Sequence, residues 1–129
     1  MKLTINADCN WKGNATVAEA AILSLKPDEI ISSGTAVVRN LLRNIMKKNI
    51  VPVVIFRPGT SLGDCLTDEH HEALLAEMNP DIYVGLHPNI TSSKYCVKNL
   101  KRAFDAGKTV YIHNGKEMKN YTDYFPVVP

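Results

Sequence analysis

The turn Ser33-Gly34-Thr35 has the residue types that hold a phosphate. It follows the apolar pair Ile30-Ile31 after one residue, Ser32, and comes directly before a helical pattern. A helix that begins at such a turn offers free backbone N–H groups and a positive dipole end, and a glycine lets an anion approach closely. The turn therefore predicts an anion site. The alternative is a plain strand-to-helix connection capped by a Ser or Thr side chain.

Other polar side chains follow the remaining strand-like runs of the chain. Arg39 falls near the start of the helix after the turn, and Arg57 stands at the tip of a third apolar run, so both could meet a phosphate or carboxylate. The alternatives are a solvent-facing Arg39 and a His87 bonded to backbone. In open α/β sheets, ligands bind outside the carboxyl ends of the strands. The predicted ligand-binding residues are Asn6, Asp8, Ser33, Gly34, Thr35, Arg39, Arg57, His87, Asn89, Thr91 and Ser92.

Strand-like and helical patterns alternate along the chain and would position these side chains. Five apolar runs predict strands, at residues 2–6, 28–33, 50–56, 81–86 and 107–113. Four helical patterns stand between them, at about residues 16–26, 35–48, 67–78 and 92–106. The alternation predicts an α/β sandwich around a mostly parallel five-stranded sheet. The run "IVPVVIF" is apolar on both faces, as in a buried parallel strand.

The inward faces of three helices follow from their spacing. In the first helix, Thr16 and Glu19 stand at capping-box spacing and mark its start. Its sheet-facing residues are predicted as Val17, Ala20, Ala21, Ser24 and Leu25; those of the second helix as Val37, Val38, Leu41, Leu42, Ile45 and Met46; those of the last helix as Cys96, Leu100, Ala103 and Phe104. Lys94, Lys98, Lys101 and Arg102 predict a solvated basic face on the last helix, with a nucleic-acid patch as the minor alternative.

The segment after the last predicted strand has no clear periodicity. It nevertheless carries apolar side chains, at Tyr121, Tyr124, Phe125, Val127 and Val128. A tail this apolar is expected to dock on its own domain or on a neighbouring subunit. We therefore divide the chain into a domain over residues 1–114 and a docking tail over residues 115–129.

Composition limits the classes of function. The chain has 129 residues, 45% of them hydrophobic and 22% charged, with a net charge of +2, which is typical of one globular domain. The charge is too small to imply a nucleic-acid partner, and no apolar run could span a membrane. The widely spaced Cys9, Cys65 and Cys96 predict reduced thiols and a cytoplasmic location. His70-His71-Glu72 lacks metal-ligand spacing on a helix, so we expect neither a metal nor another cofactor.

The order of features resembles the SLOG superfamily, the Rossmann-like group that includes the Smf/DprA proteins, the LOG phosphoribohydrolases and YspA-like proteins. The stretches that carry the resemblance are "PDEIISSGTAVVRNLL", "NIVPVVIF" and "NPDIYVGLHPNITSSKYCVKNLKRAFDAGKTVYIH". The chain keeps Gly34 of the first glycine pair of that pattern and none of the glycines of its second turn. The resemblance implies a Rossmann-like three-layer α/β/α sandwich that binds a nucleotide or a nucleotide-derived ligand.

Three functional hypotheses follow. The first is nucleotide binding at the residues named above. The second is hydrolysis of a nucleotide N-glycosidic bond, for which Asp8 and Asp64 are the candidate carboxylates. The third is a protein-interaction module in which the apolar tail holds a homodimer or another partner.

Overall fold

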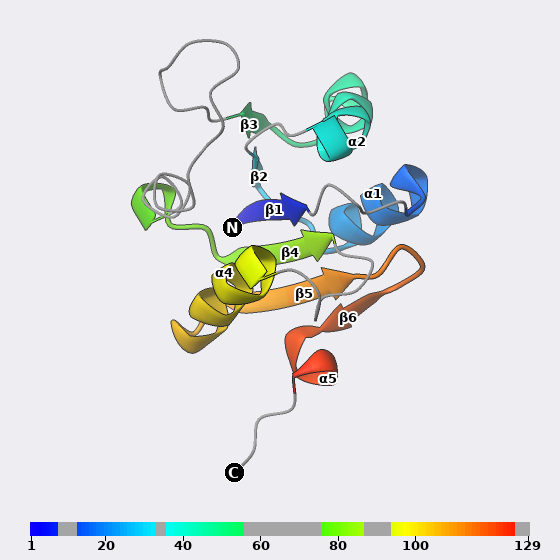
Figure 1. Cartoon of the computed structure of the whole chain (residues 1–129). Helices are drawn as coiled ribbons and strands as arrows, with labels where there is room; N and C mark the ends of the chain where they lie inside the picture. Colours follow the sequence, from blue (N-terminus) through cyan, green and yellow to red (C-terminus); the bar gives the residue numbers. More distant parts are fainter. Residues whose placement is uncertain (8–12, 33–35, 56–75, 87–93, 126–129) are drawn as a thin grey trace.

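One mostly parallel sheet carries the fold (Figure 1). The computed structural model describes residues 1–7, 13–32, 36–55, 76–86 and 94–125. Residues 76–78 are also helical. The strands are β1 (Lys2–Ala7), β2 (Glu29–Ser32), β3 (Val53–Ile55), β4 (Ile82–Leu86), β5 (Thr109–His113) and β6 (Met118–Asn120), and the helices are α1 (Ala15–Ser24), α2 (Ala36–Lys48), α4 (Lys94–Asp105) and α5 (Tyr121–Tyr124).

The strands lie in the order β3-β2-β1-β4-β5-β6. β1 is central and pairs in parallel with β2 on one side and β4 on the other, so that Leu3 stands opposite both Ile30 and Ile82. The chain therefore builds outward from β1 to β3, returns to β4 beside β1, and builds outward in the opposite direction. The point where this direction reverses lies between β1 and β4.

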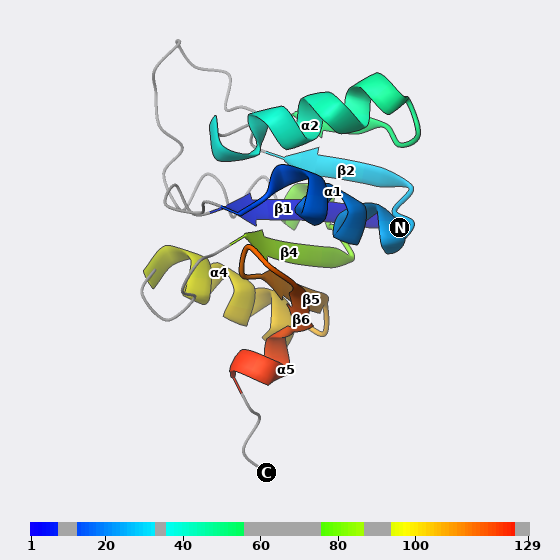
Figure 2. The ribbon, with the colours of Figure 1, turned by 90° about the vertical axis from the view of Figure 1, so that its right-hand side faces the viewer.

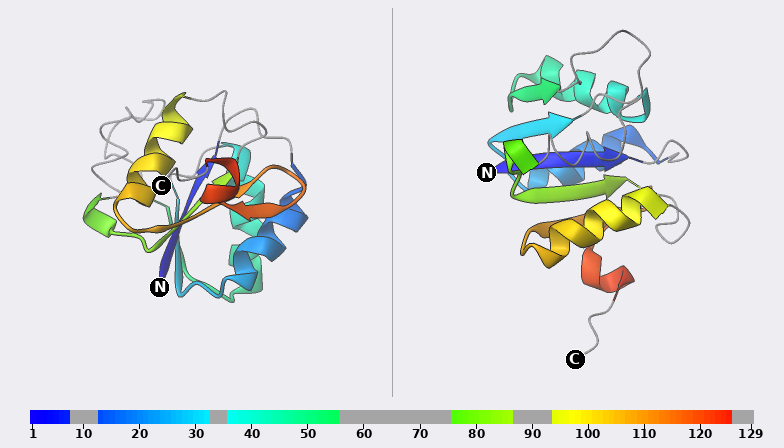
Figure 3. Two further views of the ribbon diagram at one scale, coloured as in Figure 1. Left: turned by 90° about the horizontal axis from the view of Figure 1, so that it is seen from below. Right: turned by 60° about the vertical axis from the view of Figure 1, so that its left-hand side comes forward.

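Two apolar clusters cover the two faces of the sheet. Alternate side chains of each strand point to opposite faces, so Val84 joins one cluster and its neighbour Tyr83 the other. Buried residues of α1 and α2 belong to the first cluster, and Leu100 and Ala103 of α4 to the second. Figure 2 shows α1 and α2 in front of the sheet, and the left view of Figure 3 shows α4 on the opposite side.

The predicted count of five strands is wrong, because the segment after β5 adds a sixth. β6 pairs antiparallel with β5, and α5 follows it directly. Tyr121 is buried and stacks on Phe104 and Phe125, with ring centroids 4.6 and 5.0 Å apart. A strand of three residues is too short to show a period of two, so only the apolar character of this segment was visible in the sequence.

The predicted start of the first helix is also wrong, and of its predicted inward face Leu25 packs against the core cluster whereas Val17, Ala20 and Ser24 are exposed. The cap is Asn14, whose side-chain oxygen accepts from the backbone N–H groups of Thr16 and Val17 at 2.8 and 3.3 Å. The buried residues are Ala18, Glu19 and Ile22, whereas Val17 is exposed. This helix holds small and apolar residues on every side, so its sequence gives no clear direction. The burial of Glu19 is offset by an ion pair with Lys48 at 2.6 Å, which no sequence pattern indicates.

The second helix agrees with its predicted face at three described positions and differs at one. Leu41, Leu42 and Ile45 are buried, whereas Met46 is 51% exposed near the helix end. The side chains of Val37 and Val38 lie outside the described residues. The prediction of a buried third strand is wrong, since β3 is an edge strand with Val54 38% exposed.

Helix α4 ends in a Schellman motif, as the glycine at its end predicts. Gly107 has a φ of +81°, and the N–H groups of Gly107 and Lys108 donate to the carbonyls of Phe104 and Ala103, each at 3.0 Å. Leu100 and Ala103 are buried as predicted. The Cys96 side chain and residues 67–75 of the predicted third helix lie outside the described part of the chain. Among the helices described, none is long and apolar enough to cross a membrane.

Candidate functional site

The sheet order defines where a ligand of an α/β fold would bind. At the point of reversal, Asn6 stands opposite Gly85, and Ala7 stands opposite Leu86. His113, the last residue of β5, stands opposite Leu86 on its other side. The carboxyl ends of β1, β4 and β5 therefore meet at one edge of the sheet. Ligands of open α/β sheets bind outside this edge, at the reversal point.

Two of the predicted ligand-binding residues belong to the described part of the chain. Asn6 is the fifth residue of β1, at the reversal point. Arg39 is the fourth residue of α2, and its side chain is exposed. The other predicted residues, Asp8, Ser33, Gly34, Thr35, Arg57, His87, Asn89, Thr91 and Ser92, and the candidate carboxylate Asp64, lie outside the described residues, so their roles remain predictions.

His113 is a buried imidazole at the same edge. Its side chain is 1% exposed, and its Nδ1 accepts a hydrogen bond from the Gly115 N–H at 3.0 Å. Because Nδ1 is an acceptor here, a neutral ring carries its proton on Nε2. Burial also lowers the pKa of His113. The ring is therefore neutral at neutral pH. The neighbouring Asn114 has a structural task, since its side-chain oxygen accepts from the N–H groups of Lys116 and Glu117.

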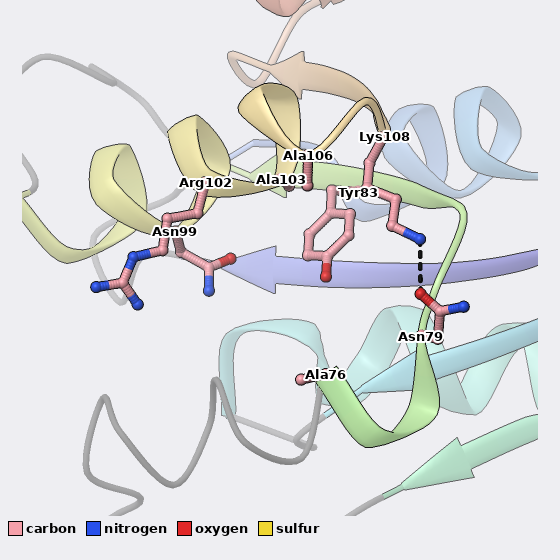
Figure 4. A pocket seen from close by; sticks show the side chains of 8 residues that line it. All are labelled: Ala76, Asn79, Tyr83, Asn99, Arg102, Ala103, Ala106 and Lys108. Carbon is pink, nitrogen blue, oxygen red and sulfur yellow. Dashed lines mark hydrogen bonds between the residues drawn. The ribbon is translucent and has the colours of Figure 1, made fainter.

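A cavity of about 300 Å³ lies on the α4 side of the sheet, and neither Asn6 nor Arg39 is among its described lining residues. It lies between α4 and the chain around residues 76–79, beside β4 (Figure 4). Its volume is at the small end of the range of about 300–1,000 Å³ that is usual for ligand pockets. The residues that line it are Ala76, Asn79, Tyr83, Asn99, Arg102, Ala103, Ala106 and Lys108.

The polar groups of this cavity favour a negative charge. Arg102 and Lys108 contribute cationic groups, and none of the lining residues that the structure describes is a carboxylate. The Lys108 ammonium donates to the Asn79 side-chain oxygen at 2.7 Å. Burial raises the pKa of the Tyr83 hydroxyl, which therefore stays protonated and able to donate at neutral pH. Asn99 is 4% exposed, so its side-chain amide is buried in the protein.

Only part of this cavity could be predicted from the sequence. The basic residues of α4 were predicted to be solvated, and Lys101 agrees, since it is exposed and pairs with Asp105 at 2.9 Å. Arg102, one residue later, is exposed as predicted and also lines the cavity. Asn99 stands four residues before the buried Ala103 and directly before the buried Leu100. The only sign of the cavity in the sequence was thus the position of the Asn99 amide next to the buried face of the helix.

Metal ligation has no support among the described residues, which contain no group of three or more His, Cys, Asp or Glu side chains able to hold an ion. His70, His71 and Glu72 lie outside them.

The chain matches no protein-family model, no curated protein and no solved structure in the three comparisons made. The geometry of the described residues therefore carries the functional argument.

Proposed function

We propose that this protein binds a nucleotide or a nucleotide-derived ligand outside the carboxyl ends of β1 and β4. The strand order β3-β2-β1-β4-β5-β6 is the observation that supports the proposal. It is the strand order of the dinucleotide-binding doubly wound folds, in which the ligand lies at the reversal of strand order. The two apolar clusters on opposite faces of the sheet further support a Rossmann-like three-layer α/β/α arrangement.

The phosphate of the ligand is proposed to lie near the start of α2. The first-turn N–H groups of a helix of this length have no partners within the helix and favour an anion. Arg39 would add a full positive charge one turn into the helix, and α2 carries no acidic residue in its first turn. A guanidinium can bind a phosphate through two parallel hydrogen bonds. Asn6 would contact the ribose or base from the neighbouring strand β1.

The packing of the C-terminal segment favours ligand binding over the interaction hypothesis. That hypothesis needs the apolar side chains after β5 to be available to a partner. Tyr121 instead belongs to the core cluster beneath α4, and Tyr124 and Phe125 pack against the same cluster. Little of the apolar surface of these three residues is thus left for a second chain, and Val127 and Val128 lie outside the described residues.

A thermal-shift panel of nucleotides, dinucleotides, nucleotide sugars and cyclic nucleotides tests the proposal. A compound present at about 100 times its Kd stabilises the folded protein by about 2.7 kcal/mol, which is easily measured. The compound with the largest shift is then titrated against Arg39→Gln and against Arg43→Gln, the matched control one turn later on α2. Loss of a charge-assisted phosphate contact worth about 1.5–3 kcal/mol should weaken binding about tenfold or more in Arg39→Gln alone.

Two results would contradict the proposal. The first is the absence of any selective shift across the panel. The second is an equal loss of affinity in both arginine variants, which would indicate attraction by the general charge of α2.

A further inference from the structure

We propose that the cavity beneath α4 is a second binding site, which takes a small organic acid. This site is independent of the proposed nucleotide site. Its lining residues on α4 begin at Asn99, whereas the helix starts at Lys94 near the carboxyl edge of the sheet. Arg102 is eight residues into the helix, which at about 1.5 Å per residue places it about 12 Å along the axis.

The arrangement of polar groups supports an acid as the ligand. Figure 4 shows Asn99 and Arg102 near one end of the cavity, Tyr83 in the middle, and Lys108 with Asn79 near the other end. A carboxylate beside Arg102 would meet a guanidinium, the donor geometry that best fits its two oxygens. The Tyr83 hydroxyl would offer a further donor from the floor of the cavity. Among the described lining residues, none carries a negative charge that would oppose the anion.

The apolar part of the lining sets the size and character of the rest of the ligand. Ala76, Ala103 and Ala106 present only methyl groups, so they leave room and contribute no polar partner. The cavity volume of about 300 Å³ equals that of about ten water molecules. An acid of about that many non-hydrogen atoms with a flat apolar body fits these limits.

The buried amide argues that the cavity is a built feature of the fold. Asn has a lower helix propensity than Ala or Leu, so either of these residues would stabilise the helix more at this position. Asn99 nevertheless stands beside Leu100 on the buried side of α4. A buried polar group beside a space lined by alanines is typical of a small-molecule pocket.

Benzoate is a suitable probe, with benzamide as the uncharged control of the same shape. The full chain labelled with ¹⁵N is titrated with each compound, and the amide signals of Ala103, Ala106 and Lys108 are followed. We expect saturable shifts with benzoate in the millimolar range, as suits a ligand this small. Benzamide should bind at least about tenfold more weakly, since it lacks the charge that Arg102 recognises.

Three variants locate the site. Arg102→Gln should weaken benzoate binding at least about tenfold, whereas Lys101→Gln removes the same charge from the adjacent exposed position and should change the affinity less than about twofold. Ala106→Leu keeps every charge but fills the cavity from the exposed end of α4, and it should abolish the shifts even if Arg102→Gln does not fold. Ala20→Leu, on the exposed side of α1, is its matched control.

The proposal is overturned by any of three results. These are no saturable shift at about 20 mM benzoate, equal affinities for benzoate and benzamide, or unchanged benzoate binding in Ala106→Leu. A nucleotide identified by thermal shift would perturb the carboxyl edge of the sheet and not these three amides. The failure of one site is therefore distinguishable from the failure of the other.

Discussion

Replacing Gly85 with alanine should destabilise the protein by about 1–2 kcal/mol, because α4 lies against the backbone of β4 at this residue. A Cβ added to Gly85 would lie 2.7 Å from Leu100 Cδ1. Leu100 is 0% exposed and belongs to the core cluster on this face, so it cannot swing into solvent. Overpacking of this kind costs about 1–3 kcal/mol. The lower backbone entropy of alanine in the unfolded chain offsets about 0.4–1 kcal/mol of it.

Urea unfolding of a double-mutant cycle measures this contact. Leu100→Ala alone should cost about 2–5 kcal/mol, because it leaves a cavity in the core. In the double variant the new methyl group at residue 85 enters that space. The double variant should therefore lose about 1–2 kcal/mol less stability than the sum of the losses in the two single variants. For a chain of this length each kcal/mol corresponds to about 4 °C in Tm, so a thermal melt should show the same order of stabilities.

Gly107→Ala is the matched control for this cycle. Gly107 also lacks a Cβ at the α4 side of the sheet, but its replacement meets no atom within 4 Å and is disfavoured only by its φ of +81°. It should therefore cost about 1–2 kcal/mol and combine additively with Leu100→Ala, within about 0.5 kcal/mol. A Gly85→Ala variant as stable as the parent, or an additive cycle at Gly85, would refute the close-packing argument.

Three further predictions test other contacts. Because burial lowers the pKa of His113, the folded state favours the neutral ring. The contribution of this ring to the free energy of unfolding should be fully present above the unfolded pKa of about 6.5, and it should be lost as the pH drops from there towards the folded pKa. Urea midpoints at two pH values should show a smaller decrease in His113→Gln, and equal decreases would contradict this. Lys48→Met should lower the free energy of unfolding in urea by about 1–2 kcal/mol. This is less than for a fully buried ion pair, because Lys48 is 53% exposed. Adding Glu19→Gln should recover part of the loss, and no recovery would argue against the ion pair. Tyr121→Ala should lower the free energy of unfolding by about 3 kcal/mol, because it removes the ring stacked on Phe104, whereas Tyr121→Phe should be about as stable as the parent. A small decrease of Tm in Tyr121→Ala would mean that α5 adds little to the core.

The sequence predicted the α/β class because its strands and helices carry local signals. The runs that became β4 and β5 are short, apolar and bounded by Pro, Gly or polar residues, and the structure confirms both. The glycine after α4 likewise predicts where the helix ends, since a left-handed residue is needed there. These features depend on a few neighbouring residues, and so they can be read without knowing the fold.

The wrong predictions concern features that depend on distant partners. Whether Val54 is buried depends on the strand order, and β3 proved to be an edge strand. Glu19 is buried because Lys48, 29 residues later, pairs with it. In both cases the residue type gave the opposite expectation, since valine usually lies inside and glutamate outside. Long-range pairing overrode the local pattern.

The two proposed sites differ in the same way. The carboxyl edge between β1 and β4 was open to prediction because any parallel sheet brings those strand ends together. The cavity beneath α4 was not, because Tyr83, Asn99 and Lys108 come from β4, α4 and the connection before β5. Only the packing of α4 on the sheet makes them neighbours.

The depth at which α4 packs is therefore a property that both sites share. The absence of a Cβ at Gly85 lets Leu100 approach the sheet, and Asn99 and Arg102 flank that leucine in the chain. The same strand residue stands opposite Asn6 at the reversal point, where the nucleotide is proposed to bind. An added methyl group would lie 2.7 Å from Leu100 Cδ1, and lifting α4 until this becomes an ordinary van der Waals contact would thus widen the cavity and displace the start of the helix together. Benzoate affinity should consequently fall in Gly85→Ala and return when Leu100→Ala is added, which links a packing contact measured by unfolding to a binding site measured by titration.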